Sequence, residues 1–471
     1  MRVLSVLVIL AILCAGSLVL ADSADGPALH SAQAPIASFV FGVYWPWERT
    51  DRIANNVGVE KWAFVQQTCE MLGRSGVNTI WVVNIGSSDT KRLAAIAGKA
   101  HIELLPCIGE IEPHNCGGTM GMDPKQADFH AKAIEYYRKT IPQVVQELGP
   151  ERANIRAWVL CDEPSGPFAD LMEPMRQIFV EADPERPVTA VSMWVDTPNL
   201  VAKTRLTTFC VDLYPFFSAG NPNGPNRPDS SRNFLTSNAQ AMVDAAGKDG
   251  RTGLLMPQCY NEIWGPYRQE RNGSLTALPG AFVHWRTPTP AEIRWQIWEG
   301  LRLGVKGTVF FCLLGPGESN EKAAPITDPA LQSLIVRQPT PVGPASLLDQ
   351  NGLATSQFSE MSALYVALGR QRELLRRLKR IETDWLTAAG GTQTGSFEDP
   401  KTGRMFVVVV NPDFDRPAEA MLTAHTRIRK VRDVLGRSNP SIHVLTDGSR
   451  TFTVSLTPGS GAILEISRSG L

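Results

Sequence analysis

The stretch of sequence that decides the fold is Ile155-Arg-Ala-Trp-Val-Leu-Cys-Asp-Glu-Pro164. Its apolar run is short and ends in two adjacent acids and a proline, which is the pattern of a buried parallel strand with a carboxylate pair at its carboxyl end. We therefore expect Asp162 and Glu163 to lie where other strand ends converge. In the alternative interpretation, the two acids cap the helix that follows them.

Seven more apolar runs of strand length occur between residues 39 and 314, and helical patterns separate them. The other expected strands are residues 39–47, 77–85, 102–108, 187–194, 208–217, 253–260 and 305–314. The expected helices are residues 59–76, 90–100, 123–148, 168–182, 197–204, 238–246 and 290–303, with a closing helix at 357–381. Such alternation indicates parallel strands joined by crossover helices. Eight units predict an α/β fold, a (β/α)₈ TIM barrel, with its site at the carboxyl ends of the strands.

The pattern changes from residue 385 onward to short alternating strands with turn residues between them. The expected strands are residues 404–411, 419–423, 427–435, 451–456 and 462–467. Glycine and proline breaks between them are typical of a small antiparallel β-sandwich. We therefore expect a barrel catalytic domain over residues 36–384 and a C-terminal β-sandwich domain over residues 385–471.

The N-terminus has the features of a secretory signal. A basic start at Arg2 is followed by an apolar run over residues 3–20 and by small residues up to Ala21. We expect a signal peptide over residues 1–21 and a secreted or periplasmic protein without membrane contact after cleavage. The alternative is a membrane-anchored protein with an uncleaved N-terminus, because the apolar run approaches the length that a bilayer needs.

The composition gives no reason to expect nucleic acid or an acidic polymer as a partner. Hydrophobic residues make up 43% of the chain, charged residues 20%, and the formal net charge is -1. These values describe an ordinary globular protein, and we expect no nucleic-acid partner. The basic run over residues 370–380 is interpreted as the solvated end of the closing helix.

Most of the cysteines lie inside strand-like apolar runs. Of eight, Cys14 falls in the expected signal, and Cys107, Cys161, Cys210, Cys259 and Cys312 are expected to pack in the core as small hydrophobic residues. A bridge between Cys107 and Cys116 is the alternative in an oxidising compartment.

Acidic and aromatic residues cluster at the expected strand ends. The candidate substrate-binding residues are Trp45, Trp47, Asn84, Glu110, Asp162, Trp194, Asp212, Tyr214, Gln258, Tyr260 and Trp264, and the candidate catalytic residues are Glu163 and Glu262. Aromatic faces pack on the C–H face of a pyranose, while carboxylates and amides bind its hydroxyls. The pattern favours a carbohydrate ligand.

Glycoside cleavage needs one protonated and one ionised carboxyl group. Glu163 is the candidate acid, because the neighbouring Asp162 charge and a partly apolar site would both raise its pKa. No cofactor is implied. The seven histidines lack zinc-site spacing. His114 beside Glu112 and Cys116 is a possible half-site, with a surface or sugar-contacting histidine as the alternative.

Three features carry a resemblance to glycoside hydrolase clan A. They are the Asp-Glu-Pro at the fourth strand tip, the aromatic and polar seventh strand, and the segment Arg294-Trp-Gln-Ile-Trp-Glu-Gly-Leu-Arg-Leu-Gly-Val-Lys-Gly-Thr-Val-Phe-Phe311. Within the clan, this eighth-strand segment and the C-terminal sandwich are most similar to family 42 β-galactosidase-like proteins. The resemblance covers about residues 38–468.

The clan implies an acid/base glutamate after the fourth strand, a nucleophile glutamate after the seventh, and retention of configuration. Glu163 matches the acid/base, with Asp162 where the clan usually has asparagine. Gln258 falls where the nucleophile is expected, and Glu262 lies four residues later.

Three alternatives for the second carboxylate follow. Glu262 reaches back as nucleophile, or Glu110, Asp212 or Glu318 supplies the carboxylate, or the protein no longer cleaves. The sequence thus predicts a secreted glycosidase (O-glycosyl hydrolase) acting on an oligo- or polysaccharide. The alternatives are a catalytically inactive carbohydrate-binding barrel and an envelope-anchored structural protein.

Overall fold

The computed structural model describes residues 34–222, 224–225, 227–316, 319–436 and 439–468. The expected signal peptide and Glu318 lie outside these residues. Among the described residues, no helix has the length and apolarity needed to cross a bilayer.

Eight parallel strands form the barrel that the sequence predicts. They are β1 (Val40–Pro46), β2 (Thr79–Ile85), β3 (Glu103–Ile108), β4 (Trp158–Asp162), β5 (Val188–Met193), β6 (Thr208–Leu213), β7 (Thr252–Pro257) and β12 (Gly307–Phe310), in the spatial order β3-β2-β1-β12-β7-β6-β5-β4. A parallel bridge between Leu104 and Ile155 links β3 to the chain that enters β4. Arg156 N donates to Leu104 O at 2.8 Å beside this bridge, so the ring closes.

Side chains of the barrel strands alternate between two apolar layers. In β1, Val40 and Tyr44 belong to the cluster inside the ring, while Phe41, Val43 and Trp45 belong to the cluster between the ring and the helices. Successive strand residues point to opposite faces, so the parity of a residue decides whether it can reach the barrel axis. This rule explains much of the placement of the candidate site residues.

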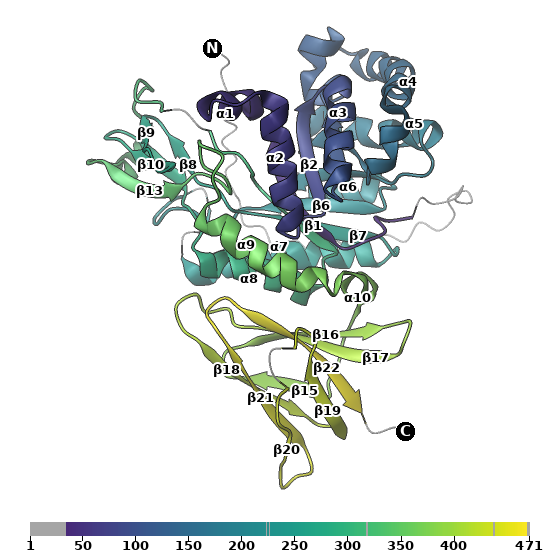
Figure 1. Cartoon of the computed structure of the whole chain (residues 1–471), viewed down its shortest axis with the longest axis vertical. Coiled ribbons are helices and arrows are strands. Elements are labelled where there is room, and N and C mark those ends of the chain that lie inside the picture. Colours follow the sequence, from purple (N-terminus) through teal and green to yellow (C-terminus); the bar gives the residue numbers. More distant parts are fainter. Residues whose placement is uncertain (1–33, 223, 226, 317–318, 437–438, 469–471) are drawn as a thin grey trace. The chain divides into compact units, whose positions relative to one another are not determined.

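Helices cover the outside of the barrel (Figure 1). They are α1 (Thr50–Asn56), α2 (Lys61–Arg74), α3 (Ser87–Lys99), α4 (Phe129–Leu148), α5 (Met172–Ala182), α6 (Thr197–Lys203), α7 (Pro228–Gly247), α8 (Pro290–Leu303) and α9 (Ser356–Gly369). The sequence signals are clear at α8, where Thr289 and Glu292 form a capping box and Gly304 ends the helix in the left-handed conformation.

The prediction of one helix over residues 357–381 is wrong. Helix α9 ends at Gly369, a short helix α10 (Arg372–Arg377) follows, and the chain then enters strand β14 (Lys379–Ile381). Strand β14 pairs with β16 (Gln393–Asp399), and Arg377 donates to both carboxylate oxygens of Asp399 at 3.1 and 3.0 Å. These tertiary contacts override the helical pattern of the basic run.

An insertion of short strands follows β7 and was not predicted. Strand β8 (Glu262–Trp264) pairs with β11 (Phe282–Trp285), and β10 (Ser274–Ala277) pairs with both β9 (Tyr267–Gln269) and β13 (Thr340–Pro344). Asn261 Nδ2 fastens the start of the insertion by donating to Gly343 O and Pro344 O at 3.2 and 2.8 Å. The insertion thereby becomes a fixed wall beside the ends of the barrel strands.

The C-terminal part consists of two antiparallel sheets, as the sequence predicts. One contains β14, β16, β17 (Arg404–Val410), β22 (Gly461–Arg468) and β19 (Ile428–Asp433), and the other contains β15 (Leu386–Ala389), β18 (Ala418–Ala424), β21 (Arg450–Leu456) and β20 (His443–Val444). Val407, Leu422, Phe452 and Leu464 are among the side chains that form the buried core between them.

The seven cysteines among the described residues are all buried and free. This burial confirms the expectation that Cys107, Cys161, Cys210, Cys259 and Cys312 pack in the core. The alternative bridge between Cys107 and Cys116 is not formed.

Candidate active site

A cavity of about 370 Å³ opens at the carboxyl ends of the barrel strands. The barrel contributes Tyr44, Asp162, Glu163, Val191, Asp212, Tyr214 and Met256 to its lining, and the loops and the insertion contribute Arg49, Tyr260, Asn261, Glu262, Trp285, Phe311, Cys312, Pro316 and Ala345. Six of the candidate site residues therefore meet in one cavity: Asp162, Glu163, Asp212, Tyr214, Tyr260 and Glu262.

Two local irregularities bring the adjacent acids Asp162 and Glu163 to the same cavity. The pairing of β4 with β5 shifts register between Val159 and Asp162, which turns Asp162 toward the barrel axis. Glu163 then has a positive φ of 56°, although it is not glycine, and its N–H donates to Val191 O at 3.0 Å. This left-handed conformation costs on the order of 1–3 kcal/mol and is typical of functional positions.

Asp162 is held by a tyrosine from the first strand. Its Oδ2 accepts a hydrogen bond of 2.8 Å from the Tyr44 hydroxyl. Burial and the charge of Glu163 raise the pKa of Asp162 to about 7, against the lowering effect of the Tyr44 bond. Asp162 therefore changes charge close to neutral pH.

Glu163 and Asp212 form a hydrogen-bonded carboxyl pair. Burial, together with the charge of Asp212 and the hydrogen bond to it, raises the pKa of Glu163 to about 9. Burial also raises the pKa of Asp212, whereas the bond from Glu163 lowers it. Two carboxyl groups in contact cannot both ionise easily. At neutral pH, Glu163 therefore stays protonated, and its O–H donates a hydrogen bond to the Asp212 carboxylate.

Glu262 lines the cavity from the insertion. Its Oε2 accepts a hydrogen bond of 3.0 Å from Trp264 Nε1. Burial raises the pKa of Glu262, and the Trp264 bond lowers it. The Trp264 ring itself stacks on His284 with the ring centres 4.2 Å apart, so this tryptophan holds the glutamate rather than lining the cavity.

Four aromatic rings pack together in the cavity wall. Tyr214 contacts Tyr260, Trp285 and Phe311 with ring centres 5.2, 5.7 and 5.4 Å apart, and Tyr260 contacts Trp285 at 5.6 Å. Trp285 and Phe311 were missed as site residues. Phe311 directly follows β12, which ends earlier than the predicted strand over residues 305–314, whereas Trp285 comes from the unpredicted insertion.

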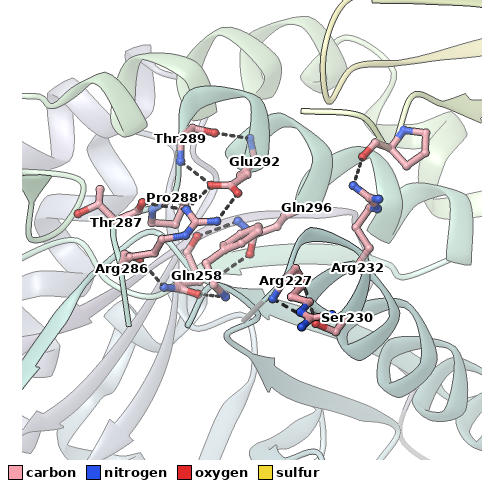
Figure 2. Close-up of polar contacts among 12 residues, drawn as sticks. Arg227, Ser230, Arg232, Gln258, Arg286, Thr287, Pro288, Thr289, Glu292 and Gln296 are labelled. Carbon is pink, nitrogen blue, oxygen red and sulfur yellow. Dashed lines mark hydrogen bonds and ion pairs between the residues drawn. The ribbon is translucent and has the colours of Figure 1, made fainter. Parts of the chain in front are cut away.

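Gln258 does not line the cavity, and its side chain is fully bonded within the protein. Its Oε1 accepts from Phe216 N at 2.8 Å, and its Nε2 donates to Tyr260 O at 3.1 Å and Arg286 O at 3.0 Å. Its backbone N–H and carbonyl bond the amide of Gln296, each at 2.8 Å (Figure 2). Gln258 therefore fixes the loops around the cavity instead of facing a substrate.

Trp45 and Trp47 lie on the helix side of the barrel. Trp45 is fully buried and donates to Thr50 Oγ1 at 2.9 Å, and Trp47 donates to Asp89 Oδ2 at 3.0 Å. Trp45 directly follows Tyr44 in β1, so its side chain points away from the barrel axis. Neither tryptophan lines the cavity.

Three other candidates also lie outside the cavity lining. Glu110 accepts hydrogen bonds from Ser87 N and Oγ at the start of α3, at 2.8 and 3.1 Å. Asn84 is exposed with a positive φ of 56° at the end of β2. Trp194 is 45% exposed and follows β5 directly.

A group of three side chains lies behind Asp162. Glu112 Oε1 is 2.9 Å from His114 Nδ1 and 3.3 Å from Cys161 Sγ, so Cys161 takes the place expected for Cys116. Burial opposes the charged imidazole, but the bond and charge of Glu112 raise the pKa of His114 overall. Hydrogen bonds within the protein account for this group, and we assign no metal to it. The charge of a protonated His114 lowers the pKa values of Asp162 and Glu163.

The comparisons with known proteins are distant. No family model matches the chain, and no curated protein matches it. Solved structures with a similar barrel include a family 5 mannosidase from Rhizomucor miehei (11% identity, 72% of this chain and 99% of that chain, TM-score 0.43) and an α-L-fucosidase of family 29 from Bacteroides thetaiotaomicron (10%, 91% and 94%, 0.49). A β-galactosidase from Marinomonas ef1 matches at 11% identity over 69% of this chain and 59% of that chain, with a TM-score of 0.44. Likenesses this distant concern the fold alone, and the fold itself rests on the strand pairing described above.

Proposed function

We propose that this protein is a glycoside hydrolase in which Glu163 is the general acid. The observation that carries the proposal is the pair of Glu163 and Asp212 in an aromatic-lined cavity at the carboxyl ends of the barrel strands. A general acid must hold a proton at working pH and lie within reach of the leaving oxygen. The contact with Asp212 keeps Glu163 protonated. The place of Glu163 in the cavity lining puts it within reach of the leaving oxygen of a bound glycoside.

An unpaired oxygen in the lining favours a ligand that carries hydroxyl groups. Asn261 Oδ1 is buried and accepts no hydrogen bond from the described residues. Buried polar atoms are normally paired, so this acceptor calls for a donor from a ligand. The packed rings of Tyr214, Tyr260 and Trp285 offer the apolar surface on which a sugar ring can lie.

Glu262 is the proposed nucleophile. Asp212 is already in contact with Glu163, whereas the two carboxyl groups of a retaining enzyme are about 5 Å apart and those of an inverting enzyme about 6.5–9.5 Å apart. Glu262 instead enters the same cavity from the separate insertion. The Trp264 N–H favours its ionised form, which a nucleophile needs.

In the proposed reaction, Glu163 protonates the glycosidic oxygen while Glu262 attacks the anomeric carbon. The leaving group departs as an alcohol, and a glycosyl ester of Glu262 remains. Glu163, now ionised, takes a proton from the water that hydrolyses the ester. The proton returns to the pair with Asp212, and the configuration at the anomeric carbon is retained.

The test is turnover of a panel of aryl glycosides by the full chain. We expect wild-type activity on at least one of them and a loss of at least about 10²-fold in Glu163→Gln, because general acid catalysis contributes about 10²–10⁴-fold. Glu185→Gln is the matched control, since Glu185 is exposed and remote from the cavity. Turnover that survives in Glu163→Gln would refute the assignment.

The role of Glu262 has a separate test. Glu262→Ala should lose turnover and regain it with added azide, and the product should be a glycosyl azide of inverted configuration. Full activity of Glu262→Ala would remove this residue as nucleophile.

A second candidate function is carbohydrate binding without cleavage. Gln258 favours it, because the position expected for the nucleophile holds an amide that is bonded to the backbone. Glycan binding without turnover of any glycoside would select this function.

A further inference from the structure

Three consecutive apolar side chains are exposed at the tip of β5. Met193, Trp194 and Val195 are 37, 45 and 50% exposed. Elsewhere in the described residues, exposed large apolar side chains occur singly or, at Val444 and Leu445, as a pair. An apolar run of this kind beside a cavity is typical of a binding surface.

The strand register places this tip beside the catalytic pair. Met193 is paired with Asp212 across β5 and β6, and Val191, two residues earlier, is paired with Asp162. Because residues two apart on a strand face the same side, Met193 faces the same way as Val191, which lines the cavity. The charge of Asp196, in the turn after β5, also acts on both Glu163 and Asp212.

The Trp194 ring packs against an aromatic ring of α7. Phe234 of α7 contacts its ring edge-on, with the ring centres 5.7 Å apart and the planes at 82°. This contact holds the indole in place while nearly half of the residue stays open to solvent. A supported, exposed ring is suited to stacking on a flat ligand.

We propose that Met193, Trp194 and Val195 bind the leaving group of the substrate, and that this leaving group is an apolar aglycone such as an aromatic ring. The proposal rests on the function proposed for Glu163. The glycosidic oxygen must lie at Glu163, and the sugar that is cleaved occupies the cavity beyond it, so the leaving group starts beside Met193.

The chemistry of the three side chains selects an apolar leaving group over a second sugar. Apart from the indole N–H, they offer no hydrogen-bonding group. A sugar ring on this surface would have hydroxyl groups that face the methionine and valine side chains and find no hydrogen-bond partner there. An aromatic ring would bury only apolar surface against them.

The test measures binding of phenyl and methyl 1-thioglycosides, which resist hydrolysis, by calorimetry on the full chain. Both anomers of the glucose, galactose, mannose and xylose series are used. We expect the phenyl compound of at least one series to bind about tenfold more tightly than its methyl partner, as stacking on one ring predicts. In Trp194→Ala the difference should fall to about twofold while methyl binding stays unchanged, and Trp194→Phe should keep most of it.

Leu445→Ser is the control, because Leu445 is an exposed apolar residue that directly follows β20 in the C-terminal part. Equal affinity for phenyl and methyl compounds would overturn the proposal, as would tighter binding of an S-linked disaccharide, or absence of binding in every series. A variant that weakens both compounds equally would also overturn it. Failure of the proposed function would appear separately, as absence of turnover of O-aryl glycosides by a protein that still prefers the phenyl thioglycoside.

Discussion

Removal of the Asp212 charge should move the alkaline limit of activity to lower pH. As the proposed general acid, Glu163 acts only while it is protonated, and burial and the contact with the Asp212 carboxylate raise its pKa to about 9. Wild-type kcat/KM should therefore fall as the pH rises through about 9. In Asp212→Asn the side chain keeps its shape and loses its charge, so Glu163 should give up its proton at lower pH.

The size of the shift follows from the contact between the two groups. Two unit charges about 4 Å apart interact by about 4 kcal/mol at an effective dielectric constant of about 20. At about 1.4 kcal/mol per pH unit, the alkaline limit should move down by about 3 units. Asp196→Asn is the graded control, because the Asp196 charge also raises the pKa of Glu163 but ranks below Asp212 among the causes.

The assay is a kcat/KM profile between about pH 4 and 10 on the best aryl glycoside, where the two limbs report the essential acid and base of the free enzyme. Thermal unfolding of each variant at every pH separates loss of the acid from loss of the fold. An alkaline limb that stays within about half a unit of wild type in Asp212→Asn would refute the reasoning, because the shift expected from the charge is several times larger.

Three further predictions use the same site. Glu163→Gln should raise the Tm by about 2 °C or more at pH 8 and leave it nearly unchanged at pH 4. Folding raises the pKa of Glu163 to about 9. Between its unfolded-state pKa and about 9, a rise in pH ionises this group only in the unfolded state, so the free energy of unfolding falls. Glutamine does not ionise and avoids this loss. Gln258→Glu should lower the free energy of unfolding in urea by about 2–4 kcal/mol without adding activity, because the new oxygen faces two backbone carbonyls. Trp264→Phe should move the acidic limb of the pH profile upward, since it removes the hydrogen bond that lowers the pKa of Glu262.

The barrel could be predicted from the sequence because its strands and helices have different periods. Each apolar run of the barrel corresponds to a strand, and the boundaries differ by a few residues. The break after Gly369 could not be predicted in this way. It depends on the pairing of β14 with β16 and on Arg377 meeting Asp399, which are partners distant in the sequence.

The sequence predicted where the site lies better than it predicted which residues line it. Asp162, Asp212 and Tyr214 follow from strand ends alone, because parallel strands bring their carboxyl ends together. Trp45 does not reach the cavity because it lies one residue after Tyr44. The register of β1 directs Tyr44 to the axis and Trp45 to the helix side. Trp285 depends on the short strands β8 and β11, whose three or four residues are too few to show a period.

The conformation of Glu163 accounts for the part of the chemistry that no pattern could give. With regular alternation, Asp162 and Glu163 would face opposite sides of the sheet, and only one of them would reach the cavity. The register shift in β4 and the left-handed φ of Glu163 bring both inward, and the second acid then meets Asp212. A proton held between those two carboxyl groups is what makes Glu163 an acid at neutral pH, so the strained turn and the raised pKa belong to one arrangement. Glycine at position 163 would relieve the strain of the turn, but it would also remove the carboxyl group. The acid and its strained conformation therefore come together, and the register shift of β4 is what directs both acids to the cavity.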